Sequence, residues 1–146
     1  MGDNVEMSTP ADAGVRLWLL WKQVSELVRA SVVADVIESS DLSEPEMTVL
    51  VHLNGSGGTA RQNALAASTG WDRTRLSHLL TRMESRGYLS RARLRNGVEV
   101  TLEAAGAEVI ARTEPPLAAA VERHLTGRLS AAQQQALRDI LETLRS

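Results

Sequence analysis

Residues 59–102 read TARQNALAASTGWDRTRLSHLLTRMESRGYLSRARLRNGVEVTL, and this stretch decides the fold of the chain. Its first part predicts a short helix over residues 60–68, because Thr59 and Gln62 have the spacing of an N-terminal capping box. Gly70 then supplies the left-handed residue that commonly follows the last turn of a helix. We therefore expect a helix followed by a tight turn at the start of this stretch.

A second helix is expected directly after this turn, beginning at Asp72, whose carboxylate can accept hydrogen bonds from the first N–H groups. Its apolar residues define one buried face: Leu76, Leu79, Leu80 and Met83. The opposite face carries hydrogen-bond donors: Arg73, Thr74, Ser77, His78, Thr81 and Arg82. Such donors favour a helix in the major groove of DNA, where they meet base edges and phosphates. A solvated helix with scattered arginines is the competing interpretation.

A β-hairpin is expected after this helix, because Asn96-Gly97 is a strong turn signal. A two-residue loop at this dipeptide would put the arginines and valines of the two strands on one face. A three-residue loop over residues 95–97 would pair Leu94 with Val98 and separate an apolar face from an arginine face. We expect the three-residue loop, with three arginines available to DNA: Arg91, Arg93 and, at the tip, Arg95.

The order helix, turn, helix and hairpin predicts a winged helix-turn-helix in a mainly α (α+β) chain. Short motifs between residues 15 and 145 resemble the multiple antibiotic resistance regulator (MarR) family. These motifs are Leu42-Ser43-x-x-Glu46, Ala64-Leu65-Ala66, Arg73-Thr74-x-Leu76-Ser77, Arg82-Met83-Glu84-x-Arg86-Gly87-Tyr88-Leu89 and Val100-Thr101-Leu102-x-x-x-Gly106. The chain departs from the family pattern in its wing, which is short and lacks the usual Asp-Arg-Arg-type segment.

The resemblance implies a homodimer that binds double-stranded DNA and regulates transcription. It also implies that a small, often aromatic effector binds between the first helix and the winged motif. We expect a repressor that such a ligand releases from a pseudo-palindromic operator. A winged helix used as a protein-interaction module, without a DNA target, is the alternative, and it would carry exposed apolar anchors in place of the arginines.

The positive charge is concentrated on the expected DNA-binding stretch. The whole chain of 146 residues has a formal net charge of −2. Residues 61–95 hold eight arginines against two carboxylates, a local charge of +6, whereas residues 1–60 carry −6 and residues 96–146 carry −2. Local charge, and not the total, sets the attraction to phosphate. This distribution favours nucleic acid as the partner.

The segments on either side of the winged motif are expected to be helical and to form a dimerisation region. Helical patterns run over residues 12–39 and after residue 103, and apolar residues keep their phase across Pro115-Pro116. The two prolines therefore predict a kink, or two helices nearly end to end. We expect one domain over residues 1–146, with the winged helix-turn-helix at 43–102 and dimerisation helices at 12–39 and 103–146.

The composition disfavours several classes of function. Cysteine is absent and the three histidines have no metal-ligand spacing, so disulfides, metals and other cofactors are not expected. No nucleophile elbow, phosphate loop or paired-carboxylate pattern points to an enzyme. The first ten residues are polar and acidic, unlike a signal peptide, and no apolar run could span a membrane. We expect a cytoplasmic protein.

Two sets of binding residues follow from these patterns. The DNA-binding set is Arg61, Arg73, Thr74, Arg75, Ser77, His78, Thr81, Arg82, Arg91, Arg93 and Arg95. The effector-binding set is Arg16, Trp18, Trp21, His52 and Trp71. Core or dimer packing is the alternative role for the tryptophans, and a satisfied core position is the alternative for the histidine.

Overall fold

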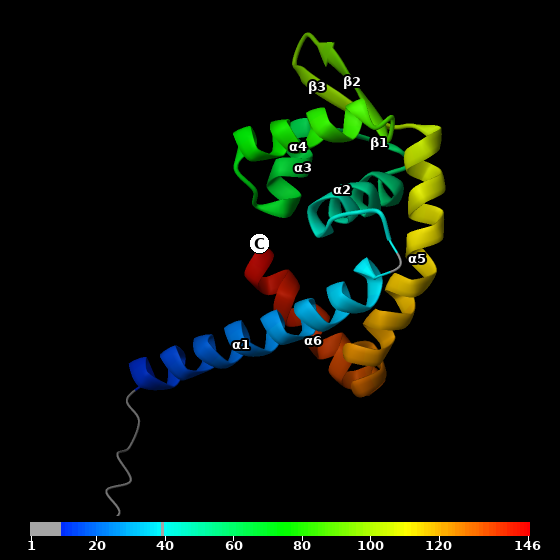
Figure 1. Cartoon of the computed structure of the whole chain (residues 1–146). Coiled ribbons are helices and arrows are strands. Elements are labelled where there is room, and N and C mark those ends of the chain that lie inside the picture. Colours follow the sequence, from blue (N-terminus) through cyan, green and yellow to red (C-terminus); the bar gives the residue numbers. More distant parts are fainter. Residues whose placement is uncertain (1–9, 39) are drawn as a thin grey trace, which may run out of the picture. The chain divides into compact units, whose positions relative to one another are not determined.

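The computed structural model describes residues 10–38 and 40–146 (Figure 1). Residues 1–9 and Ser39 lie outside the described residues, and with them most of the polar N-terminal segment and the expected end of the first helix. The helices are α1 (Pro10–Ile37), α2 (Glu44–Gly55), α3 (Gln62–Thr69), α4 (Arg73–Ser85), α5 (Ala104–His124), the 3₁₀ turn η1 (Thr126–Arg128) and α6 (Ala131–Arg145). The strands are β1 (Thr59–Arg61), β2 (Leu89–Leu94) and β3 (Gly97–Leu102). The predicted class, mainly α with a small sheet, is confirmed.

The described chain divides into two compact units. The first comprises residues 10–34 and 121–146, and the second comprises residues 35–120. The second unit contains α2, the three strands, α3, α4 and most of α5.

The core of the second unit is built from the apolar faces of α2 and α4 together with the base of the sheet. Leu50, Leu53, Leu76, Leu80 and Met83 are fully buried there. The face predicted for α4 is therefore confirmed, because all four of its apolar residues are buried. Deleting one such leucine side chain typically costs about 2–5 kcal/mol of stability.

The start of α3 differs from the prediction. Thr59–Arg61 forms strand β1 and pairs antiparallel with β3, and α3 begins only at Gln62. No side chain caps its N-terminus, so the capping box predicted at Thr59 and Gln62 is wrong. The ladder to β3 satisfies backbone groups of residues 59–61 and so takes precedence over the local capping pattern.

The turn before α4 and the N-terminal cap of α4 follow the prediction. Gly70 adopts the left-handed conformation, with φ of 70°, and ends α3. The Asp72 carboxylate then accepts hydrogen bonds from the backbone N–H groups of Thr74 and Arg75, at 3.0 and 3.1 Å. At the other end Gly87 has φ of 77° and turns the chain toward β2. These two turns fix the length of α4 and where it begins.

The sheet has the strand order β1-β3-β2, and the register of its hairpin differs from the prediction. Leu94 pairs with Gly97, which leaves a two-residue turn at Arg95 and Asn96. Neither of the registers considered from the sequence has this pairing. Gly97 has φ of 141°, which residues with a side chain rarely adopt, and this explains why the glycine ends the turn.

In this register the arginines and valines share one face of the hairpin, which the prediction had separated. Arg91 lies opposite Val100, and Arg93 lies opposite Val98. The face is not uniformly apolar or polar along its length: Val100 is fully buried, Arg91 is half-buried and Arg93 is exposed. Burial therefore falls from the base of the hairpin to its tip. An arginine near the base can face the core because the apolar stem of its side chain can be buried while the guanidinium finds polar partners.

The α5 helix continues through Pro115 and Pro116 as a single helix over residues 104–124. Of the two alternatives predicted at the prolines, a kink or two helices nearly end to end, the second is therefore wrong. Both prolines lack the N–H group that would bond four residues back, which leaves the carbonyls of Ala111 and Arg112 without their usual helical donors.

The first unit consists of most of α1, the end of α5, η1 and α6. Ser130 and Gln133 form a capping box at the start of α6. On α1, hydrogen bonds from Arg29 hold the pKa of the Glu26 carboxyl below its ordinary value. Many large apolar side chains of this unit are exposed.

Candidate nucleic-acid interface

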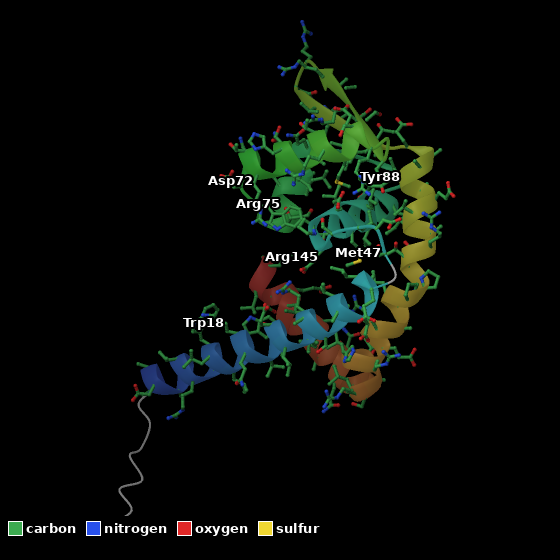
Figure 2. The ribbon with its side chains drawn as sticks, in the orientation of Figure 1. Trp18, Met47, Asp72, Arg75, Tyr88 and Arg145 are labelled. Atoms are coloured by element: carbon green, nitrogen blue, oxygen red, sulfur yellow. The ribbon has the colours of Figure 1, made fainter. Side chains whose placement is uncertain are left out.

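The exposed face of α4 carries the predicted donor side chains. Six of the seven predicted residues on this helix are exposed, and the seventh, Ser77, is half-buried. Figure 2 shows Asp72 and Arg75 at one end of α4, and Tyr88 follows the other end. The β2–β3 hairpin, which we call the wing, projects from the second unit beside this helix (Figure 1). Helix and wing therefore offer two neighbouring surfaces for one ligand.

Most of the arginines of these two surfaces are unpaired. Within the described residues, the side chains of five have neither a hydrogen bond nor an ion pair: Arg73, Arg75, Arg82, Arg93 and Arg95. A protein surface seldom gains from unpaired like charges unless an oppositely charged ligand neutralises them. A polyanion such as the phosphate backbone of DNA would do so.

Arg91 is different from the other arginines of the wing. Its Nη2 donates to the Thr81 hydroxyl at 2.7 Å and lies 3.3 Å from the Glu84 carboxylate. The backbone N–H of Arg91 donates to the second oxygen of Glu84 at 3.0 Å. The structure therefore brings Arg91 and Thr81, both predicted to contact DNA, into contact with each other.

Arg61 is also engaged within the protein. Its Nη1 donates to the side-chain carbonyl of Asn96 at 2.9 Å, so that β1 is tied to the tip of the wing. The two residues joined by this bond are 35 positions apart in the sequence, and the bond depends on the observed register of the hairpin. Arg61 itself remains exposed.

The predicted effector residues fall into both units. Arg16, Trp18 and Trp21 lie on α1 in the first unit, where all three are exposed, and Figure 2 labels Trp18. His52 on α2 and Trp71 before α4 are half-buried in the second unit. A groove of about 350 Å³ lies in the first unit, lined by residues 125–145 of η1 and α6, and none of the five residues lines it. The effector set stays a prediction.

The described residues contain no group of three or more His, Cys, Asp or Glu side chains that could hold a metal ion. Nor does any helix among them have the length and hydropathy that a membrane crossing requires.

Comparison with known proteins shows which families and structures this chain resembles. Residues 42–102 match a family model described as a domain of unknown function, DUF7343. No curated protein matches the chain. Among solved structures the chain is similar to AbsC, a MarR family transcriptional regulator from Streptomyces coelicolor, with 28% identity and a TM-score of 0.78. The similarity covers 97% of this chain and 99% of AbsC.

A second similar structure is Sco3205, a MarR family transcriptional regulator from the same organism, solved in complex with DNA. It shares 25% identity over 98% of this chain and 91% of its own, with a TM-score of 0.80. The chain matches the MarR family of winged-helix proteins. The MarR-type fold also appears at lower identity in CouR from Rhodococcus jostii RHA1, solved with p-coumaroyl-CoA, at 20% identity over 88% of this chain and 91% of that one, with a TM-score of 0.78.

One cluster in this MarR-type structure was missed by reasoning from the sequence. Arg86, at the C-terminal end of α4, donates to Glu46 at 2.8 Å and to the carbonyl of Asp41 at 3.4 Å. Its guanidinium also lies over the Tyr88 ring, 4.6 Å from the ring centre. The sequence identifies Glu46 only as the last residue of the motif Leu42-Ser43-x-x-Glu46. The spare carboxylate oxygen of that buried residue was the signal that an arginine should lie nearby.

Proposed function

We propose that this protein is a sequence-specific, DNA-binding transcriptional regulator of the MarR type. The observation that carries the proposal is the exposed face of α4, whose arginines, threonines and histidine are held in place by a fully buried opposite face. A helix of this kind can place donors against base edges in the major groove. The similarity to a MarR-family protein solved with DNA supports the same function.

The charge of the two surfaces supports DNA over a neutral partner. Five arginines whose side chains have no partner among the described residues lie together on α4 and the wing. Those of α4 would contact the major groove or its phosphates, and Arg93 and Arg95 would contact the backbone or the minor groove beside it. Each phosphate neutralised should steepen the salt dependence of binding by about 0.9 in log K against log salt.

The alternative, a winged helix that binds proteins, has less support. A protein-binding surface usually exposes large apolar or aromatic anchors. Within residues 43–102 Leu94 is the single large apolar side chain that is clearly exposed, and its exposed fraction is 37%. The donor face of α4 contains none.

The exposed apolar residues of the described chain support a homodimer formed by the terminal helices. Apart from Leu94 they all lie on α1 or α6, and they include Trp18, Leu27 and Leu144. A soluble protein rarely leaves so much apolar surface on two helices uncovered. A second copy that covers them would present two α4 helices to half-sites about 34–36 Å apart on DNA.

We further propose that the regulator is a repressor that a small aromatic or anionic effector releases. The effector residues would be Arg16, Trp18, Trp21, His52 and Trp71. A ligand that binds one arrangement of the dimer more tightly would shift the population toward it and change the spacing of the α4 helices. Regulation would then need no contact between effector and DNA.

Selection of bound fragments from random DNA tests the function most simply. We expect a pseudo-palindromic consensus and a steep loss of affinity between about 50 and 200 mM salt. Arg82→Ala serves as the matched variant, since Arg82 is exposed and without a partner on α4. The protein-interaction alternative would be favoured by two results together: the selection enriches no DNA sequence, and the parent and Arg82→Ala are retained equally on a heparin column.

A further inference from the structure

We propose that Arg91 and Glu84 form an anchor that fixes the wing to α4, and that Arg91 positions the DNA-contacting arginines without contacting DNA itself. The inference rests on the proposed DNA-binding function. It divides the arginines of the wing into one that holds the wing and two, Arg93 and Arg95, that are free to bind.

The anchor consists of both side-chain and backbone contacts. One oxygen of the Glu84 carboxylate accepts the backbone N–H of Arg91 at 3.0 Å, and the other lies 3.3 Å from Nη2 of the same residue. Nη2 also donates to the Thr81 hydroxyl at 2.7 Å, and Nη1 reaches the carbonyl of Ser77 at 3.5 Å. One residue of β2 is thereby tied to three residues along the last turns of α4.

The burial of these groups separates Arg91 from its neighbours on the wing. The Arg91 side chain is 19% exposed and the Glu84 side chain is 39% exposed. Arg93, two residues further along the same face of the hairpin, is exposed and has no partner. A guanidinium that is already bonded and half-buried would have to give up these bonds before it could bind a phosphate. The Glu84 carboxylate beside it would also repel that phosphate.

The chemistry of the anchor requires an arginine. The planar guanidinium can direct several N–H groups at once toward a hydroxyl, a carbonyl and a carboxylate, whereas an ammonium offers a single charged point. Fixing the wing before DNA arrives lowers the entropy lost on binding, because the wing arginines already have their spacing from α4. Arg91 would thus contribute to operator affinity as a positioning residue.

The experiment compares Arg91→Gln and Glu84→Gln with the matched control Arg93→Gln. On the selected operator, Arg93→Gln should flatten the slope of log K against log salt by about 0.9. Arg91→Gln should leave that slope unchanged and weaken operator binding about twofold to fivefold, the range for a partly exposed ion pair. Glu84→Gln should weaken operator binding similarly, although removal of a negative charge near DNA should by itself strengthen it.

Two further variants separate the anchor from a phosphate contact. The double variant Glu84→Gln/Arg91→Gln should lose no more operator affinity than either single variant, because both remove the same interaction. Arg91→Lys should not restore affinity, since lysine keeps the charge and lacks the planar fork. Recovery by lysine, a flatter slope in Arg91→Gln, or tighter operator binding by Glu84→Gln would each overturn the proposal.

Amide hydrogen exchange in the free protein tests the anchor without DNA. Exchange of the wing amides should quicken about twofold to fivefold in Arg91→Gln and Glu84→Gln and stay unchanged in Arg93→Gln. If the parent selects no DNA sequence, the proposed function fails and this measurement alone decides on the anchor. Equal exchange rates of the wing amides in the parent, Arg91→Gln, Glu84→Gln and Arg93→Gln would overturn the proposed anchor.

Discussion

Arg86 donates from Nη1 to Glu46 at 2.8 Å and so joins the C-terminal end of α4 to the first turn of α2. The Glu46 side chain is 12% exposed, while that of Arg86 is 42% exposed. The other oxygen of the Glu46 carboxylate accepts a hydrogen bond from the backbone N–H of Ser43 at 3.0 Å and completes the capping box of α2. One carboxylate therefore caps one helix and fixes the end of another, the helix proposed to meet DNA.

Glu46→Gln should lower the free energy of unfolding by about 1–2 kcal/mol, because a glutamine can still complete the capping box but cannot form the ion pair. Chemical denaturation followed by circular dichroism measures the loss. Arg82→Gln is the control, since Arg82 is an exposed residue of the same helix without a partner, and its effect should stay within about 0.5 kcal/mol. Equal stability of the two variants would show that the ion pair contributes nothing.

Gly106→Ala should destabilise the protein strongly. A Cβ atom at Gly106 would lie 2.2 Å from the backbone oxygen of Tyr88 and 2.8 Å from Cδ1 of Leu102. Backbone has to move to relieve such a contact, at a cost of about 1–3 kcal/mol or more. Thermal unfolding provides the measurement.

Gly14→Ala is the control for that substitution. Gly14 also lies in a helix, but a Cβ atom there meets nothing within 4 Å. Alanine should therefore stabilise α1 by up to about 1 kcal/mol. If both alanines shift the melting temperature in the same direction, the close packing of α5 on the chain after α4 is not as described.

The α4 helix could be predicted from the sequence because its determinants are local. The Asp72 cap, the apolar spacing and the turn at Gly70 all depend on residues close together in the sequence, and all are confirmed. The exposed donor face follows from the same periodicity. The element proposed to read DNA was therefore the most predictable part of the chain.

The sheet was mispredicted because its determinants are not local. Strand β1 exists through pairing with residues some forty positions later, as in the pair Thr59 and Thr101, and no local pattern reveals it. The hairpin register was predicted by separating arginines from valines. That rule failed because Arg91 buries most of its side chain and finds partners on α4. The observed register thus places Arg91 where it can form the anchor to α4.

Charges placed on the apolar stripe of α6 should dissociate the proposed dimer. Ile140→Glu combined with Leu144→Glu puts two carboxylates on residues that are 55% and 71% exposed in the single chain, so folding of one chain should suffer little. In an interface the same charges would be buried without partners, at a cost of several kcal/mol. Sedimentation at micromolar concentration should then show a monomer. Ala132→Glu, an exposed substitution near the start of α6, should leave the dimer intact.

Arg95→Ala should relax the preference for bases at the flanks of the operator. Arg95 lies in the two-residue turn of the wing, and an arginine there can enter a minor groove that an A·T tract has narrowed. Affinity should fall more on operators with A·T flanks than on those with G·C flanks. Arg93→Ala, the control, should lose affinity equally on both because it meets phosphate. An equal loss for Arg95→Ala on both operators would make the tip a phosphate contact only.

The affinity of Arg82→Ala for the selected operator tests the central claim most directly. Arg82 lies on the donor face of α4, is exposed, and has no partner in the described chain, so its loss should not disturb the fold. If α4 reads DNA, operator affinity should fall by about 1–3 kcal/mol, while affinity for unrelated DNA falls much less. Binding of the operator with the affinity of the parent would contradict the assignment of this face to DNA.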